Sequence, residues 1–226
     1  MGIVAGLDGC KTGWVGVVLE EGRFVETRSL DKAVDVFAAW PEVAVLAIDI
    51  PIGLPEESTA YRREADFAAR GFLRGAASSV FPTLPFDVLS QPTFAQALAR
   101  SQDLCGRGLS RQSYALASKI IEVNELAEND ARVHEVHPEV SFREMAGRAL
   151  DGKKTWNGLM QRRGCLESVG IRLPDDLPQA RGVGADDVLD AAAAAWSATR
   201  IASGQARTLS DPPFVGSSGK PVVIYY

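Results

Sequence analysis

Five acidic residues of this sequence stand in places where a divalent cation is the simplest reason for their presence. They are Asp8, Asp49, Glu135, Asp187 and Asp190. The first two directly follow the apolar runs 2–7 and 43–48. A carboxylate inside an apolar run is costly to bury unless it is paired, and several carboxylates brought together repel one another. Because Mg2+ and Mn2+ prefer carboxylate oxygens, the pattern predicts a site for one of these cations, built from strand ends and one helix.

The chemistry of such a site is phosphodiester hydrolysis. Two cations about 3.5–4 Å apart would activate a water molecule and stabilise the leaving oxygen of the phosphodiester. Asp8 and Asp49 on neighbouring strands could bridge the ions. Asp187 and Asp190 share one helix face because they are three residues apart. Asp186 is a competing ligand and is equally suited to be the N-cap of that helix.

Each acid also has a purely structural interpretation. Asp8 precedes Gly9 and suits a turn, and Asp187 at a helix start would interact favourably with the helix dipole. Asp49 is harder to explain in this way, because a turn does not require an acid inside an apolar strand. The pattern therefore favours a function for Asp49 most strongly.

Further polar residues extend the predicted site. Lys11 lies in a glycine-bounded loop that could hold phosphate, and we expect Lys11 to stabilise the departing oxygen; a tight hairpin is the alternative. Glu135 and His137 share one face of a predicted strand, and Glu139 follows. These three could ligate metal or move protons, with ordinary salt bridges as the alternative.

Basic residues recur at helical spacing in two places. Arg63 and Arg70 flank Asp66 and could line a groove for a polyanionic substrate. The alternative is a solvated helix face with ion pairs three or four residues apart. A second basic patch surrounds Trp156, which we expect to be half-buried rather than a stacking platform for bases. Its members are Lys153, Lys154, Arg162 and Arg163.

The composition limits the classes of protein to consider. The chain has 226 residues and a formal net charge of −5, which argues against non-specific binding of nucleic acid over the whole surface. Its three cysteines show no metal-type spacing and fit the reduced thiols of a cytoplasmic protein. The sequence shows no basic leader and no apolar run long enough for a bilayer, so we expect neither secretion nor membrane insertion.

The elements that must position the acids form a mixed α/β domain. Strands are predicted over 3–7, 14–19, 24–28, 43–48, 132–137 and 222–225. Helices are predicted over 31–40, 60–73, 91–104, 113–129, 142–149, 153–166 and 186–203. We expect one domain over 1–226, with a helical insertion at about 55–130. The last strand is an edge strand that could pair with a second copy of the chain and give a homodimer, or pair with the sheet of its own chain.

This arrangement resembles the ribonuclease H-like fold, in which three antiparallel strands and then parallel strands form a central mixed sheet flanked by helices. The closer resemblance is to the domain of unknown function 429 (DUF429) family, described as predicted ribonuclease H-like nucleases. The strings that carry it are Asp8-Gly-Cys-Lys-Thr-Gly-Trp14, Ile48-Asp-Ile-Pro-Ile-Gly-Leu54, Arg63-x-x-Asp66-x-x-Ala69-Arg70, Ser79-Val-Phe-Pro82, Glu135-Val-His-Pro-Glu-Val-Ser-Phe142 and Asp186-Asp-Val-Leu-Asp190. The chain departs from the family at Ala65, in place of cysteine, and at Phe86, in place of a basic residue.

The resemblance implies a metal-dependent nuclease that hydrolyses DNA or RNA with Mg2+ or Mn2+. It assigns the cation to Asp8, Asp49, Asp187 and Asp190, with Glu135 as an extra acid. Two alternatives remain open. One is a phosphotransferase or ATP-binding protein of the actin-like ATPase fold, because residues 8–13 resemble its first phosphate loop, although the chain is too short for the usual pair of domains. The other is a non-catalytic binding module on the same fold.

Overall fold

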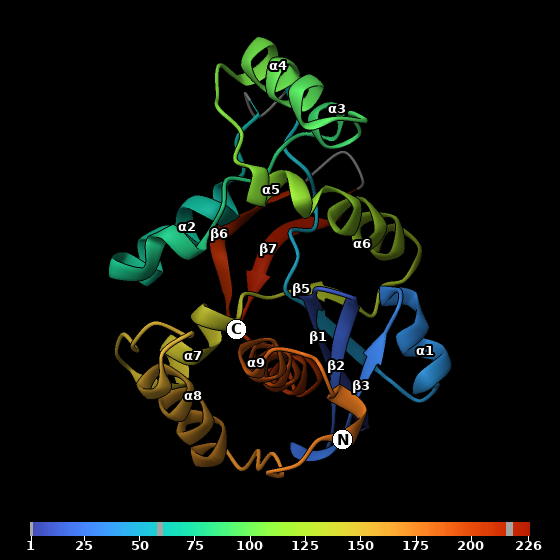
Figure 1. Ribbon diagram of the computed structural model, residues 1–226, viewed down its shortest axis with the longest axis vertical. Helices are drawn as coiled ribbons and strands as arrows, with labels where there is room; N and C mark the ends of the chain where they lie inside the picture. Colours follow the sequence, from blue (N-terminus) through green and yellow to red (C-terminus); the bar gives the residue numbers. More distant parts are fainter. Residues whose placement is uncertain (1, 58–60, 216–218) are drawn as a thin grey trace.

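A mixed sheet of five strands forms the centre of the computed structural model, which describes residues 2–57, 61–215 and 219–226 (Figure 1). Its strands are β1 (Ile3–Cys10), β2 (Gly13–Glu20), β3 (Arg23–Leu30), β4 (Val45–Ile48) and β5 (Val133–Glu135). They lie in the order β3-β2-β1-β4-β5, with β1 antiparallel to β2 and parallel to β4. The predicted α/β architecture is therefore confirmed, and it is consistent with a ribonuclease H-like fold.

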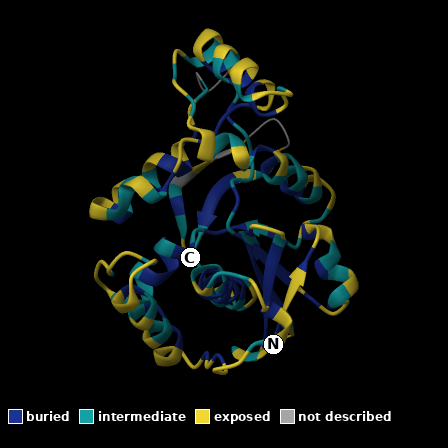
Figure 2. Cartoon of the chain, in the orientation of Figure 1, coloured by how far each residue is buried: buried dark blue, intermediate teal, exposed yellow. Residues whose placement is uncertain are grey.

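Alternate residues of the strands face two hydrophobic cores. Leu7 and Ile48 pack on one side of the sheet, and Val17 and Ala47 pack on the other. The helices that cover the sheet are α1 (Val36–Ala39) and α6 (Ala117–Asn129) on the first side, and α7 (Pro138–Ala146), α8 (Trp156–Ser168) and α9 (Ala185–Ala202) on the second. Figure 2 shows the buried residues concentrated in the strands and in α9. Burial on both faces explains the continuous apolar runs of β1 and β4.

A close contact between α9 and β1 depends on Gly6. A Cβ atom at this position would overlap backbone atoms of Ala191 and Ala195, so no larger residue fits here. Residues 191–195 are all alanines and all buried, which lets the helix backbone lie directly on the strand. The contact places Asp190, one residue before this run, beside the end of β1.

Helices between β4 and β5 form the insertion, which is the upper part of Figure 1. They are α2 (Glu64–Leu73), α3 (Phe86–Leu89), α4 (Phe94–Cys105), α5 (Arg111–Ala115) and α6. The helix predicted over 113–129 is in fact two helices that meet at Leu116. A 3-10 helix, Arg74–Ser79, begins the segment that leads to α3. The first residue of the helix predicted over 60–73 lies outside the described residues.

The structure corrects three predicted boundaries. Strand β1 runs through Asp8 to Cys10 because it stays paired with β2, although its pairing with β4 ends at Leu7. The helix predicted over 31–40 is shorter, a 3-10 turn followed by α1. Pro138 does not close a strand but begins α7, since proline is favoured at the first position of a helix. That helix ends at Ala146, before Gly147 in the left-handed conformation.

The C-terminal segment forms a second, two-stranded antiparallel sheet from β6 (Thr208–Val215) and β7 (Pro221–Tyr225). The sequence pattern did not predict β6, which contains two consecutive prolines. Strand β7 is the predicted edge strand, and its partner is in the same chain. No helix in the described part of the chain has the length and apolar character needed to cross a bilayer.

Candidate functional site

Asp8 and Asp49 are brought together by the parallel pairing of β1 and β4. The register places Leu7 beside Ile48, and the backbone N–H of Asp49 donates to the carbonyl of Leu7 at 3.1 Å. The next residue on each strand is an aspartate, so the two carboxylates lie at the carboxyl ends of adjacent strands. This edge of an open α/β sheet is where ligands usually bind.

Helix α9 adds a third carboxylate to this pair. Asp190 is 1 % exposed and lies against the end of β1 through the contact made by Gly6. Its charge and that of Asp187 act on Asp8. Asp187 is half-buried in the first turn of α9, where Gly184 also donates a backbone hydrogen bond to it. Asp8, Asp49 and Asp190 therefore form the acid cluster, with Asp187 at its edge.

Burial and mutual repulsion make these carboxylates weak acids. Burial, followed by the charges of Asp49 and Asp190, holds the pKa of Asp8 well above its ordinary range. Burial raises the pKa of Asp190 to about 7, although Lys153 opposes the shift. The pKa of Asp49 is raised by burial as well, against the opposing effects of His137 and Lys153. The folded chain holds a site where negative charge is expensive and a cation would be favourable.

Lys153 is the positive charge that meets the cluster. Its Nζ donates to Asp190 Oδ2 at 2.5 Å, and the side chain remains 37 % exposed. Burial alone would lower the pKa of Lys153, but the carboxylates of Asp190, Asp8 and Asp49 raise it. One ammonium therefore faces three carboxylates, of which Asp8 and Asp190 are buried and Asp49 is partly buried. The sequence pattern had placed Lys153 in a separate basic patch, and its role depends on a contact between residues 37 positions apart.

Carboxylate oxygens are the ligand type that hard divalent cations prefer. No three Asp, Glu, His or Cys side chains among the described residues are grouped so that they could hold a metal ion as they stand. However, Asp190 Oδ1 is fully buried and accepts no hydrogen bond from any described residue. An unpaired oxygen of a buried carboxylate is costly, and a cation bound by Asp8, Asp49 and Asp190 would relieve that cost.

Glu135 lies at the end of β5 but belongs to a second group of charges. Its Oε2 accepts from Arg63 and, at 2.8 Å, from the N–H of Ile52. Arg63 is buried and also donates to Asp66 at 2.5 Å and to the carbonyl of Gly53 at 3.0 Å. Burial raises the pKa of Glu135 to about 7, and Arg63 opposes the shift. We call Arg63, Asp66 and Glu135 the arginine-centred cluster.

The backbone stays extended from Glu135 through Val136 to His137, and the side chains of Glu135 and His137 line the same cavity. Strand β5 ends at Glu135, and His137 is the N-cap residue of α7. Here His137 acts electrostatically on Asp49, and its buried Nδ1 has no hydrogen-bond partner in the described chain. Glu139, in the first turn of α7, accepts two bonds from Arg162, at 2.6 and 2.9 Å.

A cavity of about 520 Å3 joins these groups. The acid cluster contributes Asp49 and Asp190 to its wall, next to His137 and Lys153. The segment 78–84 and helix α5 from the insertion form the opposite wall. The sequence pattern did not predict this cavity, because its walls come from elements that are distant along the chain.

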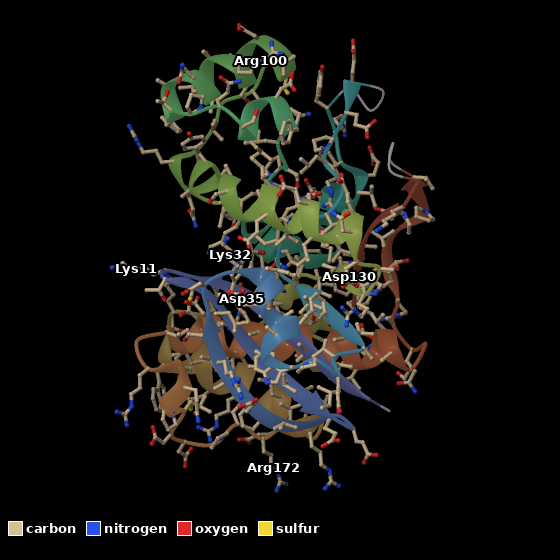
Figure 3. All side chains as sticks on the ribbon, turned by 90° about the vertical axis from the view of Figure 1, so that its right-hand side faces the viewer. Lys11, Lys32, Asp35, Arg100, Asp130 and Arg172 are labelled. Atoms are coloured by element: carbon tan, nitrogen blue, oxygen red, sulfur yellow. The ribbon has the colours of Figure 1, made fainter. Side chains whose placement is uncertain are left out.

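The other residues considered for substrate binding lie outside the acid cluster. Lys11 is exposed in the turn between β1 and β2 and points into solvent (Figure 3). Arg70 donates to the carbonyl of Val80 at 2.9 Å, and Asp66 accepts from the N–H of Thr83 at 2.7 Å. Both residues thereby hold the segment that lines the cavity. Trp156 is 73 % exposed, so the expectation that it is half-buried was wrong.

Comparison with known proteins gives one family and no individual relative. The profile of DUF429, described as a protein of unknown function, matches residues 6–214. A search of curated proteins found no match, and neither did a search of solved structures. The matched segment includes the acid cluster, the arginine-centred cluster and the whole insertion.

Proposed function

This chain belongs to the DUF429 family, and from its acid cluster we propose that it is a metal-dependent nuclease that hydrolyses phosphodiester bonds. The observation that carries the proposal is the convergence of Asp8, Asp49 and Asp190, since the charges of Asp49 and Asp190 raise the pKa of Asp8 and that of Asp49 raises the pKa of Asp190. Buried acids that a fold does not neutralise destabilise it. Such a cluster beside a cavity is typical of a functional site.

Asp8, Asp49 and Asp190 would hold Mg2+ or Mn2+, with Asp187 available at the edge of the cluster. When bound, the cation supplies a water nucleophile at neutral pH and positive charge near the phosphate. The carboxylates would present that cation to the cavity, since Asp49 and Asp190 both line its wall. The sheet and α9 bury Asp8 and Asp190 and so limit the access of bulk water to them.

In this proposal Lys153 supplies a positive charge that can move to the phosphate, and His137 carries a proton. Lys153 is more than one-third exposed, so its ammonium can leave Asp190 and contact a phosphate oxygen in the cavity. His137 has an unpartnered Nδ1 within the described chain and lies near Asp49. It is placed to hold a proton during attack or departure.

The test is hydrolysis of bis(4-nitrophenyl) phosphate and of a fluorescent single-stranded oligonucleotide, with Mg2+ or Mn2+. We expect turnover by the wild type, and a loss of at least about 100-fold in Asp49→Asn, because removal of a ligand should cost at least as much as removal of its supporting residues. Asp186→Asn is the matched control, since Asp186 is a nearby acid outside the acid cluster. Absence of metal-dependent turnover in the wild type, or full activity in Asp49→Asn, would refute the proposal.

A further inference from the structure

The cavity beside the acid cluster is lined by two chemically different groups of residues, which we call its polar end and its apolar end. The polar end carries Asp49, His137, Lys153 and Asp190, from the sheet edge and the segments around α7, α8 and α9. The apolar end is contributed by the insertion, with Val80, Phe81, Leu84, Leu89, Leu116 and Ile120. A cavity of about 520 Å3 lies in the range that encloses one small organic ligand. A molecule that fills it must therefore combine a charged group with a flat or apolar one.

Charge around the cavity favours a ligand with a single phosphate. The two basic side chains among the described lining residues are already paired, Lys153 with Asp190 and Arg162 with Glu139. A duplex or a long strand needs several Lys or Arg side chains free to neutralise consecutive phosphates. A bound divalent cation together with Lys153 would instead match one phosphate group.

The apolar end has features that suit a heteroaromatic base. Phe81 lines the cavity and is 36 % exposed, so one part of its ring is free to stack. Gln112 and Ser113 of α5 add an amide and a hydroxyl to the same wall, which an aliphatic chain could not use. Bases bind proteins by stacking on aromatic rings while polar groups contact their edges.

The wall that carries these residues is held in place before any ligand binds. Arg70 bonds the carbonyl of Val80 and Asp66 bonds the N–H of Thr83, so the chain on both sides of Phe81 is anchored. Asp66 is in turn fixed by the buried Arg63. A preformed wall reduces the ordering cost of binding.

We propose that the site takes one unpaired nucleotide, with the base in the apolar end of the cavity and the phosphate at the acid cluster. The substrate is then a nucleotide or the unpaired end of a strand, and a base-paired internal position does not fit. This inference rests on the proposed function for the placement of the phosphate, and it adds the identity of the group beside the phosphate.

The first experiment is calorimetric titration of the wild type with nucleoside 5′-monophosphates in the presence of Mg2+. Ribose 5-phosphate, which lacks the base, and hexyl phosphate, which carries a flexible chain, are the comparison ligands. We expect at least one nucleotide to bind about 10-fold or more tightly than either, because stacking of one base contributes that much. Equal affinity of all three ligands would overturn the inference, and tighter binding of hexyl phosphate would assign the cavity to another phosphate ester.

Two exposed aromatic residues provide a matched pair of variants. Phe81→Ala should weaken nucleotide binding about 10-fold while ribose 5-phosphate binding stays unchanged, and Phe81→Tyr should retain the nucleotide affinity. Trp156→Ala should change neither, because Trp156 does not line this cavity although it is more exposed. The opposite result, with loss only in Trp156→Ala, would place the nucleic acid on the outer surface and refute the inference.

Failure of this inference can be distinguished from failure of the proposed function. Metal-dependent hydrolysis of bis(4-nitrophenyl) phosphate, without base-dependent binding, would support the nuclease and refute the nucleotide cavity. Base-dependent binding that Phe81→Ala removes, without hydrolysis of any phosphodiester, would support the cavity and refute the nuclease.

Discussion

Two groups of carboxylates lie near the carboxyl-terminal edge of the central sheet, one around β1 and β4 and the other around β5, and the chain neutralises them in different ways. In the arginine-centred cluster, the guanidinium of Arg63 bonds both Glu135 and Asp66 and is itself buried. In the acid cluster, three carboxylates share one partly exposed ammonium, that of Lys153. An oxygen of Asp190 is left without any described partner. The first group has its partners in the folded chain, whereas the second leaves a carboxylate oxygen that the proposed cation would contact.

Aspartate occurs in both groups, so residue type does not distinguish a structural role from a functional one. Both groups contain acids that follow apolar strands, and burial raises the pKa of Glu135 and of Asp190 to about 7 alike. What differs is the number of hydrogen bonds and opposite charges around each acid. We therefore choose the proposed cation ligands by the completeness of their partners, because burial and pKa do not distinguish the two groups.

The largest expected effect is on the arginine-centred cluster. Arg63→Met should destabilise the protein by about 3–5 kcal/mol, because it leaves Glu135 and Asp66 buried without their common cation. Urea unfolding measures this loss, and added Mg2+ should not restore it. Arg62→Ala is the control, since Arg62 is exposed and should change stability by no more than about 0.5 kcal/mol. A stable Arg63→Met protein with lower cation affinity would reverse the roles of the two clusters.

The opposite sign is expected in the acid cluster. Asp8→Asn should stabilise the metal-free protein by about 1–2 kcal/mol, because it removes a buried charge that Asp49 and Asp190 repel. The same substitution should abolish the rise in melting temperature that Mg2+ gives the wild type. Thermal melting of both proteins with and without Mg2+ checks both statements. Destabilisation of the metal-free variant would show that Asp8 is structural.

The sequence was sufficient for the acids that follow strands of the central sheet. Apolar runs buried on both faces predicted β1 and β4, and parallel pairing then placed Asp8 beside Asp49. The spacing of Asp187 and Asp190 predicted one shared helix face, but the contact of the alanine run with Gly6, which brings Asp190 to the same place, is known only from the structure. Strands β1 and β4 could be predicted because their apolar runs are local features of the sequence. Parallel pairing then places the carboxyl ends of both strands at one edge of the sheet.

Other parts of the site depend on contacts that local pattern does not contain. The start of a helix at Pro138, where the pattern predicted only the end of a strand, makes His137 an N-cap residue. Lys153 reaches Asp190 across 37 residues, and Arg63 reaches Glu135 across 72. The wall of the cavity is held by Arg70 and Asp66, whose spacing predicted only a helix face. Long-range partners therefore decide which predicted acids remain available for a ligand.

Changes in pH should separate the two clusters further. The folded-state pKa of Asp190 is raised to about 7, so its contribution to stability is present below its ordinary pKa and is lost as pH rises through about 7. The metal-free protein should therefore be more stable at pH 5.5 than at pH 8, with a slope of at most about 1.4 kcal/mol per pH unit for each such group. Mg2+ binds the deprotonated acids, so its stabilising effect should grow with pH up to about 7 and then level off.

Glu135 provides the control for this dependence. Its pKa is also raised to about 7, so it gives a slope of the same sign, but one that Mg2+ should not change. Unfolding of Asp190→Asn and Glu135→Gln across this pH range distinguishes the two contributions. Mg2+ should reduce the pH dependence of stability in the wild type. Only Asp190→Asn should remove the part of that dependence that Mg2+ reduces. If Glu135→Gln removed it instead, the cation would belong to the arginine-centred cluster.

The smallest effect on stability is expected for Lys153, although it sharpens the comparison most. Lys153→Met should destabilise the metal-free protein by only about 1 kcal/mol, because the side chain is 37 % exposed and water screens part of its charge. It should nevertheless strengthen Mg2+ binding, since the cation no longer competes with an ammonium for Asp190. Calorimetric titration with Mg2+ measures this change, with Lys154→Met as the exposed control. Weaker Mg2+ binding in Lys153→Met would mean that the ammonium supports the cation rather than standing in its place.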